Sequence, residues 1–277
     1  MRSTSEARTY ERAREVAVDA AWQAARVIRT HAGRLREADV RYKGMHDLVT
    51  HVDEASQALI TRLLHEAYPD DAVLAEEGAD PAAFAEGADG YRWIIDPIDG
   101  TTNFTHGLPP YAVSIALQQG TEVVLGVVLE VAHGELFTAI RGSGTYRNGV
   151  RVRVSRRPTL DRSLIATGFP YRAFGHADSY LKVFRRFMQQ TRGVRRLGAA
   201  AIDLAYVACG RFDGFFETGL NAWDVAAGTL LVEEAGGRVT DYQNMPNPLF
   251  KKQILATNGL LHEEMLDILA PMREVFT

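Results

Sequence analysis

Trp93-Ile94-Ile95-Asp96-Pro97-Ile98-Asp99-Gly100-Thr101-Thr102-Asn103 joins an apolar run to two acidic residues and a Gly-Thr-Thr turn. The apolar residues from Tyr91 to Ile95 lie between Gly90 and Pro97, which predicts a buried strand bounded by turn residues. Asp96 is expected to emerge where this strand leaves the core. Because Pro97 has a fixed φ angle and no N–H donor, the chain is expected to bend there.

The predicted bend brings together oxygen ligands for a hard cation. Asp96 and Asp99 are three positions apart and can converge on one centre, while Ile98 turns its backbone carbonyl inward. Carboxylate and carbonyl oxygens are ligands that Mg²⁺ prefers. Gly100-Thr101-Thr102 is expected to open a helix, whose free N–H groups and positive dipole end suit a phosphate. A plain turn with an Asp cap is the alternative interpretation.

Composition and charge exclude several classes of protein. The chain has 277 residues, of which 46% are hydrophobic and 24% charged, as in an ordinary globular protein of one large domain or two packed subdomains. No apolar run approaches the about 20 residues of a membrane span. A net charge of −4 argues against a general nucleic-acid binder, so Arg192, Arg195 and Arg196 are expected to be solvated surface. The N-terminus carries Glu6, Glu11 and Glu15 among its arginines and lacks a continuous apolar core, so it fits no secretory or transit signal, which predicts a cytoplasmic protein. The single Cys209 is expected to be buried.

Hydrophobic periodicity predicts the elements of the first half of the chain. One helix is expected from Glu6 to Thr30, with small residues for close packing, and another from near Thr50 through Leu64. A polar loop is expected from Gly78 to Gly90. Asn148-Gly149 predicts a tight hairpin, since Asn-Gly readily adopts the positive φ angles of a type I′ turn. Before that hairpin, three strands are expected to form an antiparallel meander: Tyr111–Leu117, Val123–Val131 and Leu136–Ile140.

Helices and strands alternate beyond the hairpin. The expected strands are Leu164–Thr167, Phe212–Phe216, Arg238–Thr240 and Ile254–Ala256. The expected helices are Ser179–Gln190, Ala200–Ala208, Trp223–Glu234 and Leu261–Leu269. The pattern therefore predicts an α+β fold of two subdomains, residues 1–150 and 151–277. No glycine-rich linker separates them, so they are expected to act as one functional unit.

Further acidic residues could complete a metal site, because two carboxylates and a carbonyl leave a hard cation short of ligands. Val73-Leu74-Ala75-Glu76-Glu77 repeats the layout of an apolar run followed by acids, although paired glutamates are also common on solvated surfaces. Asp224 stands at the start of an apolar helix, where an N-terminal cap is the alternative interpretation. Asp47 and Asp53 lie beside the expected helix start near Thr50, and cap or turn roles also explain them.

Taken together, these segments resemble the inositol monophosphatase family of metal-dependent, lithium-sensitive sugar phosphatases, from Lys43 to the last helix. The motifs that carry the resemblance follow the family's order: Asp47-Leu48-Val49-Thr50 with Asp53, Glu76-Glu77, Trp93–Asn103, Gly198-Ala199-Ala200, and Trp223-Asp224-Val225-Ala226-Ala227-Gly228 with Glu234-Ala235-Gly236-Gly237. The resemblance implies a layered α/β/α/β/α sandwich, usually a homodimer, with Mg²⁺ held between the two halves.

The resemblance also implies a set of metal ligands for two to three Mg²⁺ ions per active site. It assigns the first ion to Glu76, Asp96 and the carbonyl of Ile98, and the second to Asp96, Asp99 and Asp224. Asp96 would bridge the two ions. A third, looser ion would lie near Glu76, with Asp53 as a nearby acidic support.

The same resemblance assigns the remaining catalytic and substrate-binding residues. Thr101 would pair with Glu76 to orient and deprotonate a metal-bound water that attacks phosphorus. Backbone N–H groups at Gly100 and Thr101, with Thr102 beside them, would hold the phosphate. The positions matching substrate contacts are Gly198, Ala199, Ala200, Glu217 and Asp224. Many relatives have a hydroxyl residue where Ala199 stands, so one side-chain contact is missing here.

The metal-binding motifs do not distinguish between substrates within this family. The expected partner is a small phosphorylated polyol or sugar, with inositol monophosphate ranked first, because the chain has the size of the simple bacterial inositol phosphatases and no insertion for a nucleotide. Fructose 1,6-bisphosphate ranks second. Histidinol phosphate, 3′-phosphoadenosine 5′-phosphate and NADP are further alternatives.

A hypothesis from another class is a binding role, since some bacterial relatives also act as partners of the transcription machinery. A purely binding descendant would be free to lose its carboxylates. Glu76, Asp96, Asp99 and Asp224 are all present, which favours catalysis.

Overall fold

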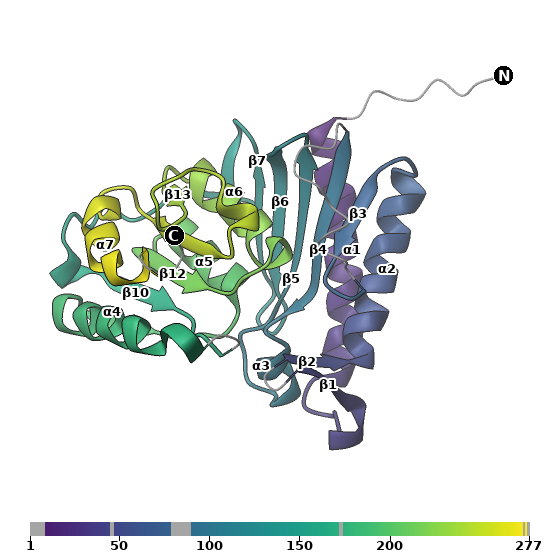
Figure 1. The fold of residues 1–277 in the computed structure, drawn as a ribbon. Helices are drawn as coiled ribbons and strands as arrows, with labels where there is room; N and C mark the ends of the chain where they lie inside the picture. Colours follow the sequence, from purple (N-terminus) through teal and green to yellow (C-terminus); the bar gives the residue numbers. More distant parts are fainter. Residues whose placement is uncertain (1–8, 45–46, 79–89, 172–173, 274, 276–277) are drawn as a thin grey trace.

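Two large sheets organise the protein in the computed structural model, which describes residues 9–44, 47–78, 90–171, 174–273 and 275 (Figure 1). The larger sheet has its strands in sequence order: β3 Ala72–Ala75, β4 Tyr91–Asp99, β5 Ala112–Gln119, β6 Glu122–Glu130, β7 Glu135–Ile140, β8 Gly144–Arg147 and β9 Val150–Val152. β3 and β4 are parallel, and from β4 onward each strand is antiparallel to the next. The predicted antiparallel meander is thus confirmed as the centre of this sheet.

The second sheet has crossover connections. Its strands lie in the order β11 Gly193–Arg195, β10 Leu164–Thr167, β12 Gly214–Thr218, β14 Gln253–Thr257 and β13 Arg238–Thr240. β10 is parallel to β11 and β12, whereas β14 is antiparallel to β12 and β13. A separate hairpin consists of β1 Val40–Gly44 and β2 Asp47–Thr50. The chain passes from the larger sheet to the second one between Val152 and Leu164, and the division into residues 1–150 and 151–277 stays a prediction.

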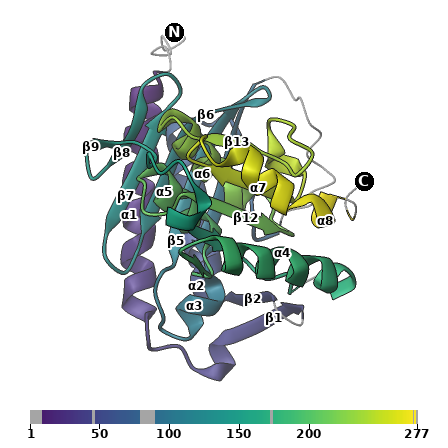
Figure 2. The ribbon, with the colours of Figure 1, turned by 90° about the vertical axis from the view of Figure 1, so that its left-hand side faces the viewer.

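Helices cover and separate the two sheets in layers (Figures 1 and 2). The helices are α1 Tyr10–His31, α2 His51–Ala67, α3 Thr101–Thr105, α4 Ala177–Gln190, α5 Ala200–Ala208, α6 Ala222–Glu234, α7 His262–Ile268 and α8 Ala270–Arg273. α1 and α2 pack on one face of the larger sheet, α5 and α6 lie between the sheets, and α4 and α7 cover the far face of the second sheet. This arrangement confirms the layered α+β fold.

Small residues set the spacing between these layers. α1 buries six alanines against the larger sheet: Ala13, Ala17, Ala20, Ala21, Ala24 and Ala25. On the other face of that sheet, a Cβ added at Gly126 of β6 would lie 2.8 Å from the carbonyl oxygen of Ala227 in α6. The bare backbone of Gly126 therefore allows α6 to approach the sheet closely. α6 carries Asp224 at its N-terminus, so this contact also fixes the height of that acid above the sheet.

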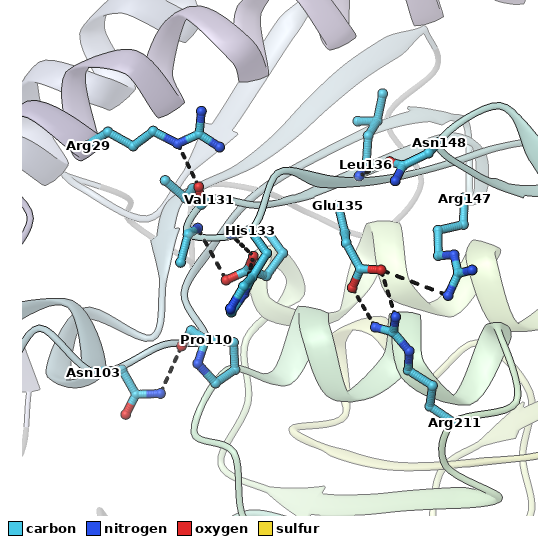
Figure 3. Close-up of polar contacts among 12 residues, drawn as sticks. Arg29, Asn103, Pro110, Val131, His133, Glu135, Leu136, Arg147, Asn148 and Arg211 are labelled. Carbon is cyan, nitrogen blue, oxygen red and sulfur yellow. Dashed lines mark hydrogen bonds and ion pairs between the residues drawn. The ribbon is translucent and has the colours of Figure 1, made fainter.

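Polar contacts join the layers around the turn between β6 and β7 of the larger sheet (Figure 3). Arg29 of α1 donates from Nε to the carbonyl oxygen of Val131 at 2.7 Å. Glu135 of β7 forms a bidentate pair with Arg211, which follows α5. Such paired contacts between planar groups hold a fixed orientation. These contacts hold α1 and the end of α5 against the same end of β6 and β7.

Most predicted elements agree with the structure to within a few residues. At the hairpin, Asn148 and Gly149 have φ angles of 49° and 78°, as the type I′ turn requires. The first helix begins at Tyr10, and the predicted start at Glu6 and most of the Gly78–Gly90 loop lie outside the described residues. β4 runs on to Asp99 instead of ending at Ile95, and Cys209 is half-buried instead of buried. None of the described helices is long and apolar enough to cross a membrane.

Candidate active site

A bulge at the end of β4 brings two acids together. Asp96 pairs with Ser114 of β5, and the next pair is Asp99 with Ala112, so the register shifts between them. A bulge of this kind tolerates Pro97, which cannot donate to the ladder, and re-aims the neighbouring side chains. The N–H of Ile98 donates to Asp96 Oδ1 at 3.0 Å. The side chains of Asp96 and Asp99 are only 1% and 6% exposed.

Asp224 joins these two acids from a different layer. Its Oδ2 accepts from the N–H of Asn221 at 2.6 Å, so it does cap the start of α6. The same carboxyl group offers an oxygen that lies within 4.8 Å of oxygens from Asp96 and Asp99. The cap and the metal-ligand interpretations are therefore compatible, because the same carboxyl group accepts the N–H of Asn221 and belongs to the acidic cluster.

Burial and mutual repulsion perturb the ionisation of this cluster. Burial raises the pKa of Asp96 well above its usual value, and the charges of Glu76, Asp99 and Asp224 raise it further. Burial and then Asp224 raise the pKa of Asp99 to about 8, although N–H donors from Ala201 and Ala200 oppose the shift. Among the described residues, neither Asp96 nor Asp99 forms an ion pair with a basic side chain. A cation is the missing partner of such a set.

The donor set fits Mg²⁺. Asp96, Asp99 and Asp224 provide oxygens only, with no sulfur or imidazole in the cluster. Glu76 and Ile98 line the same pocket as the three aspartates. Hard divalent cations select carboxylate and carbonyl oxygens, and Mg²⁺ commonly retains waters to complete its shell.

The first turns of α2 position the acids and the threonine of this site. Thr50 caps α2, and both its N–H and its hydroxyl donate to Asp53 Oδ2, at 2.9 and 2.6 Å. The other oxygen, Asp53 Oδ1, lies 3.1 Å from the hydroxyl of Thr101. That hydroxyl also lies 3.0 Å from the carbonyl oxygen of Ile98. The structure therefore gives the Thr101 hydroxyl a carboxylate partner in Asp53, and the joint action of Thr101 and Glu76 on a water stays a prediction.

A glutamine one turn further along α2 forms two hydrogen bonds with the backbone just after β3. Gln57 donates from Nε2 to the carbonyl oxygen of Glu77 at 2.7 Å and accepts from the N–H of Glu77 at 2.8 Å. The N–H of Glu76 donates to the carbonyl oxygen of Ile95 at 3.1 Å, which continues the pairing of β3 with β4. Glu76 is thus held from both sides along the backbone. The sequence reasoning did not identify Gln57, because an exposed-looking Gln in a helix carries no local signal for such a contact.

Gly100 and Asn103 hold the turn against the second half of the chain. Gly100 has a φ angle of 89°, and an added Cβ would lie 3.2 Å from the Cβ of Ala199 and 3.1 Å from the carbonyl oxygen of Gly198. Asn103 donates from Nδ2 to the carbonyl oxygen of Pro110 at 2.8 Å (Figure 3). The same Nδ2 also donates to the carbonyl oxygen of Leu197 at 2.8 Å. One amide therefore bridges the turn and the segment that leads into α5.

The N-terminus of α5 binds Asp99. The N–H groups of Ala200 and Ala201 donate to its two carboxylate oxygens at 3.2 and 2.8 Å. Free N–H groups at a helix start favour an anion, and here a side chain of the protein supplies it. The backbone N–H of Ala200, a predicted substrate contact, is accordingly occupied by Asp99.

A pocket of about 770 Å³ collects most of the predicted site residues. The predicted residues that line it are Glu76, Asp96, Ile98, Asp99, Gly100, Thr101, Thr102, Gly198, Ala200, Glu217 and Asp224. Asp53 is buried behind Thr101, and Ala199 is buried beneath Gly100, so neither is a lining residue. Ala199 therefore supports the turn.

The lining also includes residues that sequence reasoning did not predict. Tyr42 and Leu48 come from the β1–β2 hairpin, which had not been predicted. Arg196 is exposed, as expected for solvated surface, and it also lines the pocket, with its guanidinium 5.6 Å from the ring of Phe169 and 5.2 Å from that of Tyr171. Stacking on aromatic rings holds a guanidinium in place. A run of arginines carries no signal that singles out this one.

Comparisons with known proteins agree with this geometry. The sequence model of the inositol monophosphatase family matches residues 9–274. The chain is 46% identical over 258 residues to the Nus factor SuhB of Pseudomonas aeruginosa, an alignment that covers 92% of this chain and 95% of that protein. It is 44% identical over 253 residues to an inositol-1-monophosphatase of Mesorhizobium japonicum, covering 91% and 93%. The solved structure of the IMPase of Thermotoga maritima matches with a TM-score of 0.84 at 36% identity, covering 95% of this chain and 98% of that one.

Proposed function

The chain belongs to the inositol monophosphatase family, and we propose that it is a Mg²⁺-dependent phosphatase that hydrolyses inositol monophosphate to inositol and phosphate. The family is metal-dependent, typically on Mg²⁺. One observation carries the proposal: a single pocket contains the Asp96, Asp99 and Asp224 cluster, the Thr101 hydroxyl and the carboxylate of Glu217. That combination suits a phosphate ester at one end and an alcohol with hydroxyl groups at the other.

Mg²⁺ would be held by the aspartate cluster with Glu76 and the carbonyl of Ile98. When bound, it neutralises the acidic cluster, lowers the pKa of water and stabilises the charge that develops on the phosphate oxygens. Two to three ions are proposed for the complete site. The backbone of Gly100 and Thr101, with Thr102 beside it, is proposed to contact the phosphate.

Thr101 and Asp53 would orient the attacking water. The proton of the Thr101 hydroxyl is directed toward Asp53 Oδ1 or the carbonyl of Ile98, so its oxygen can accept a hydrogen bond from a water in the pocket. Burial raises the pKa of Asp53, with the charge of Glu77 adding to the shift, while hydrogen bonds from Thr50 and Thr101 oppose it. A raised pKa makes the Asp53 carboxylate a stronger base for the proton that the water loses. Glu76, which follows β3 beside β4, would share this role as a base.

The substrate preference is proposed to come from the far side of the pocket. Glu217 ends β12 and lines the pocket together with Gly198 and Ala200. A carboxylate accepts hydrogen bonds only, and therefore selects hydroxyl groups of the departing alcohol. Inositol monophosphate, with five free hydroxyl groups, suits this acceptor better than a phosphate ester of a plain alcohol.

A phosphate-release assay tests the proposal directly. The purified protein would be given inositol 1-phosphate, fructose 1,6-bisphosphate, histidinol phosphate, 3′-phosphoadenosine 5′-phosphate and NADP, each with Mg²⁺ and with a chelator. We expect turnover only with Mg²⁺, fastest for inositol 1-phosphate. Much faster turnover of a nucleotide or of histidinol phosphate would show that inositol monophosphate is not the preferred substrate. Turnover in the presence of the chelator would overturn the metal assignment.

A second candidate function rests on the name of a relative. The protein of Pseudomonas aeruginosa that is 46% identical to this chain is called a Nus factor, so a binding role in transcription is proposed alongside catalysis. Affinity capture from the native host with wild type and Asp96→Asn would separate the two functions. If both proteins retain components of the transcription machinery, the binding role is supported. If neither protein retains them, the binding role is rejected. The homodimer, the cytoplasmic location and lithium sensitivity stay predictions.

A further inference from the structure

The carboxyl group of Glu217 lies against a glycine of the neighbouring strand. β10 and β12 are parallel, and their last pair is Thr167 with Phe216, so Gly168 and Glu217 are the next residues along both strands. A Cβ added at Gly168 would lie 1.9 Å from both the carboxyl carbon and Oε1 of Glu217, and 2.3 Å from Oε2. The φ angle of Gly168 is not in the left-handed region, so its backbone conformation is open to other residues. What the glycine provides is the space that the carboxyl group occupies.

Three buried side chains from separate elements lie close enough to the same carboxylate to be affected by its charge. They are Asp203 of α5, Tyr180 of α4 and Tyr242, which follows β13. Burial raises the pKa of all three, and the negative charge of Glu217 raises each one further. The pKa of Tyr180 reaches about 12. Tyr180 and Tyr242 are therefore uncharged near neutral pH and can donate through their O–H groups, and the raised pKa of Asp203 favours its protonated form, which can donate as well.

Asp203 stands out among the three because its polar group is incompletely satisfied. The side chain is 1% exposed, and its Oδ1 has no hydrogen-bond partner among the described residues. Its charged neighbours are Glu217, Asp99 and Arg196, all of which line the pocket. Ala200, which precedes it by less than one turn of α5, also lines the pocket. Asp203 thus lies just beneath the pocket wall, behind Glu217.

Buried polar groups without partners are rare in folded proteins, and one beside a binding pocket calls for a role there. A structural role in the core does not explain Asp203, since a leucine or methionine of similar size would fill a helix position between two sheets without the cost of desolvating a carboxyl. An uncharged carboxyl next to a carboxylate can donate its single proton to it. That donation would leave the other lone pairs of Glu217 directed at the pocket.

We propose that Gly168 and Asp203 are positioning residues that fix the direction of the Glu217 carboxylate, and so give the pocket its preference for a phosphorylated alcohol with several hydroxyl groups. Gly168 supplies the space, and Asp203 supplies a donor from behind. Neither residue lines the pocket, so both act through Glu217. The proposal deepens the proposed function and rests on it.

Gly168→Ala tests the steric half of the proposal. The added methyl group displaces the Glu217 carboxylate, and we expect the KM for inositol 1-phosphate to rise about tenfold with kcat nearly unchanged, since a hydrogen bond to a charged group is lost. The kcat/KM for p-nitrophenyl phosphate, whose leaving group has no aliphatic hydroxyls, should change less than about twofold. The matched control is Gly193→Ala on β11 of the same sheet, where an added Cβ approaches nothing nearer than Arg195 Nη1 at 3.2 Å. Equal losses on both substrates, or no loss on either, would overturn the proposal.

Asp203 is tested by a pair of variants. Asp203→Asn keeps a donor of the same shape and should retain a KM within about threefold of wild type. Asp203→Leu removes the donor and should reproduce the effect of Gly168→Ala on inositol 1-phosphate alone. If Asp203→Leu does not fold, Asp203→Ser replaces it, because its short side chain cannot reach Glu217. Loss of discrimination in Asp203→Asn, or normal discrimination in the variant without the donor, would refute the role of Asp203.

Failure of the proposed function gives a different result from failure of this inference. If the wild-type protein hydrolyses p-nitrophenyl phosphate but not inositol 1-phosphate, the proposed substrate is wrong, and the same variants are measured with the polyol phosphate that the wild type prefers. The inference itself fails when the wild type discriminates between a polyol phosphate and p-nitrophenyl phosphate and the variants discriminate equally well.

Discussion

Buried carboxyl groups occur in two regions of the molecule with opposite surroundings. Asp213, which precedes β12, is fully buried and meets donors on every side: the hydroxyl of Ser155, the guanidinium of Arg157 at 2.9 Å and the N–H of Leu164 at 2.7 Å. In the pocket, Asp96 and Asp99 are almost as buried but meet mainly other acids. A buried charge is tolerated only when it is paired. The first region is therefore complete as it stands, whereas the second requires a cation.

The contrast separates structural from functional acids by their neighbours and not by their burial. Burial alone would place Asp213 and Asp96 in the same class. The donors around Asp213 stabilise one arrangement of the chain, because they join the segment before β10 to the start of β12. The repulsion around Asp96 instead destabilises the metal-free fold, a cost that is typical of ligand sites.

The largest effect is expected from Asp96→Asn, which removes the central charge of the acidic cluster. We expect Mg²⁺-dependent phosphate release to fall at least about a thousandfold, because the site loses the carboxylate that we propose as a ligand of both ions. The melting temperature without Mg²⁺ should be unchanged or higher, since one of the crowded carboxylates is gone. Asp19→Asn on the exposed face of α1 is the matched control. Retained turnover in Asp96→Asn would refute the two-metal assignment.

The pH dependence of the metal-free protein should reverse the usual behaviour of an acid in a salt bridge. Burial and Asp224 raise the pKa of Asp99 from 3.8 to about 8. Between these values the folded state binds more protons than the unfolded state, so the free energy of unfolding falls as the pH rises, by up to about 1.4 kcal/mol per pH unit. Mg²⁺ should restore stability most strongly near pH 8, where the carboxylates are available to it.

Urea unfolding across that pH range, with chelator or with Mg²⁺, measures this dependence. Asp99→Asn serves as the control, because it should flatten the pH dependence in chelator. A metal-free stability that rises with pH from 5 to 8 would contradict the prediction, since it would mean that these carboxylates are already paired.

Asp213→Ala should lower the folding stability and leave kcat unchanged, the opposite of what we expect for Asp96→Asn. Removing the carboxylate leaves the N–H of Leu164 and the guanidinium of Arg157 without their acceptor, and breaking such a buried pair costs about 3 kcal/mol of folding free energy. The kcat of the remaining folded protein should be unchanged, since Asp213 is not among the pocket residues. Denaturant unfolding together with kcat per folded molecule decides the point. A loss of kcat at normal stability would remove the distinction between the two regions.

Sequence patterns predicted those parts of the fold that depend on near neighbours. The Asn148-Gly149 hairpin, the cap at Thr50 and the limits of α5 at Ala200 and Ala208 follow from local backbone preferences and periodicity. β4 was predicted too short because a proline usually ends a strand, and the bulge between Asp96 and Asp99 accommodates it. The β1–β2 hairpin was not predicted, because both strands are short and only the first, Val40-Arg41-Tyr42-Lys43, alternates apolar and charged residues.

In the candidate site, too, features set by near neighbours in the chain were predicted, and contacts between distant segments were not. The acids were visible in the sequence because each lies beside an apolar run, and the resemblance ordered them. Their supports were not visible, because each is a contact between distant segments: Asn103 to Leu197, Ala201 to Asp99, and Gln57 to Glu77. A hydrogen bond to a backbone group places no demand on the type of the residue that receives it. Such contacts therefore leave no pattern in a single sequence.

The smallest effect is expected from Gln57→Ala, which tests whether the acidic cluster depends on its backbone support as strongly as Asp213 depends on its donors. The substitution removes the hydrogen bonds that Gln57 makes to the backbone N–H and carbonyl oxygen of Glu77, and so loosens the backbone next to Glu76. Outer-shell contacts that orient ligands typically change metal affinity by about tenfold. We expect a Mg²⁺ titration of phosphate release to shift to about tenfold higher concentration, with the maximal rate nearly restored at saturating Mg²⁺. Gln23→Ala, which removes a similar amide bonded to exposed Asp19, is the control. An unchanged titration midpoint would show that strand pairing with Ile95 alone holds Glu76 in place.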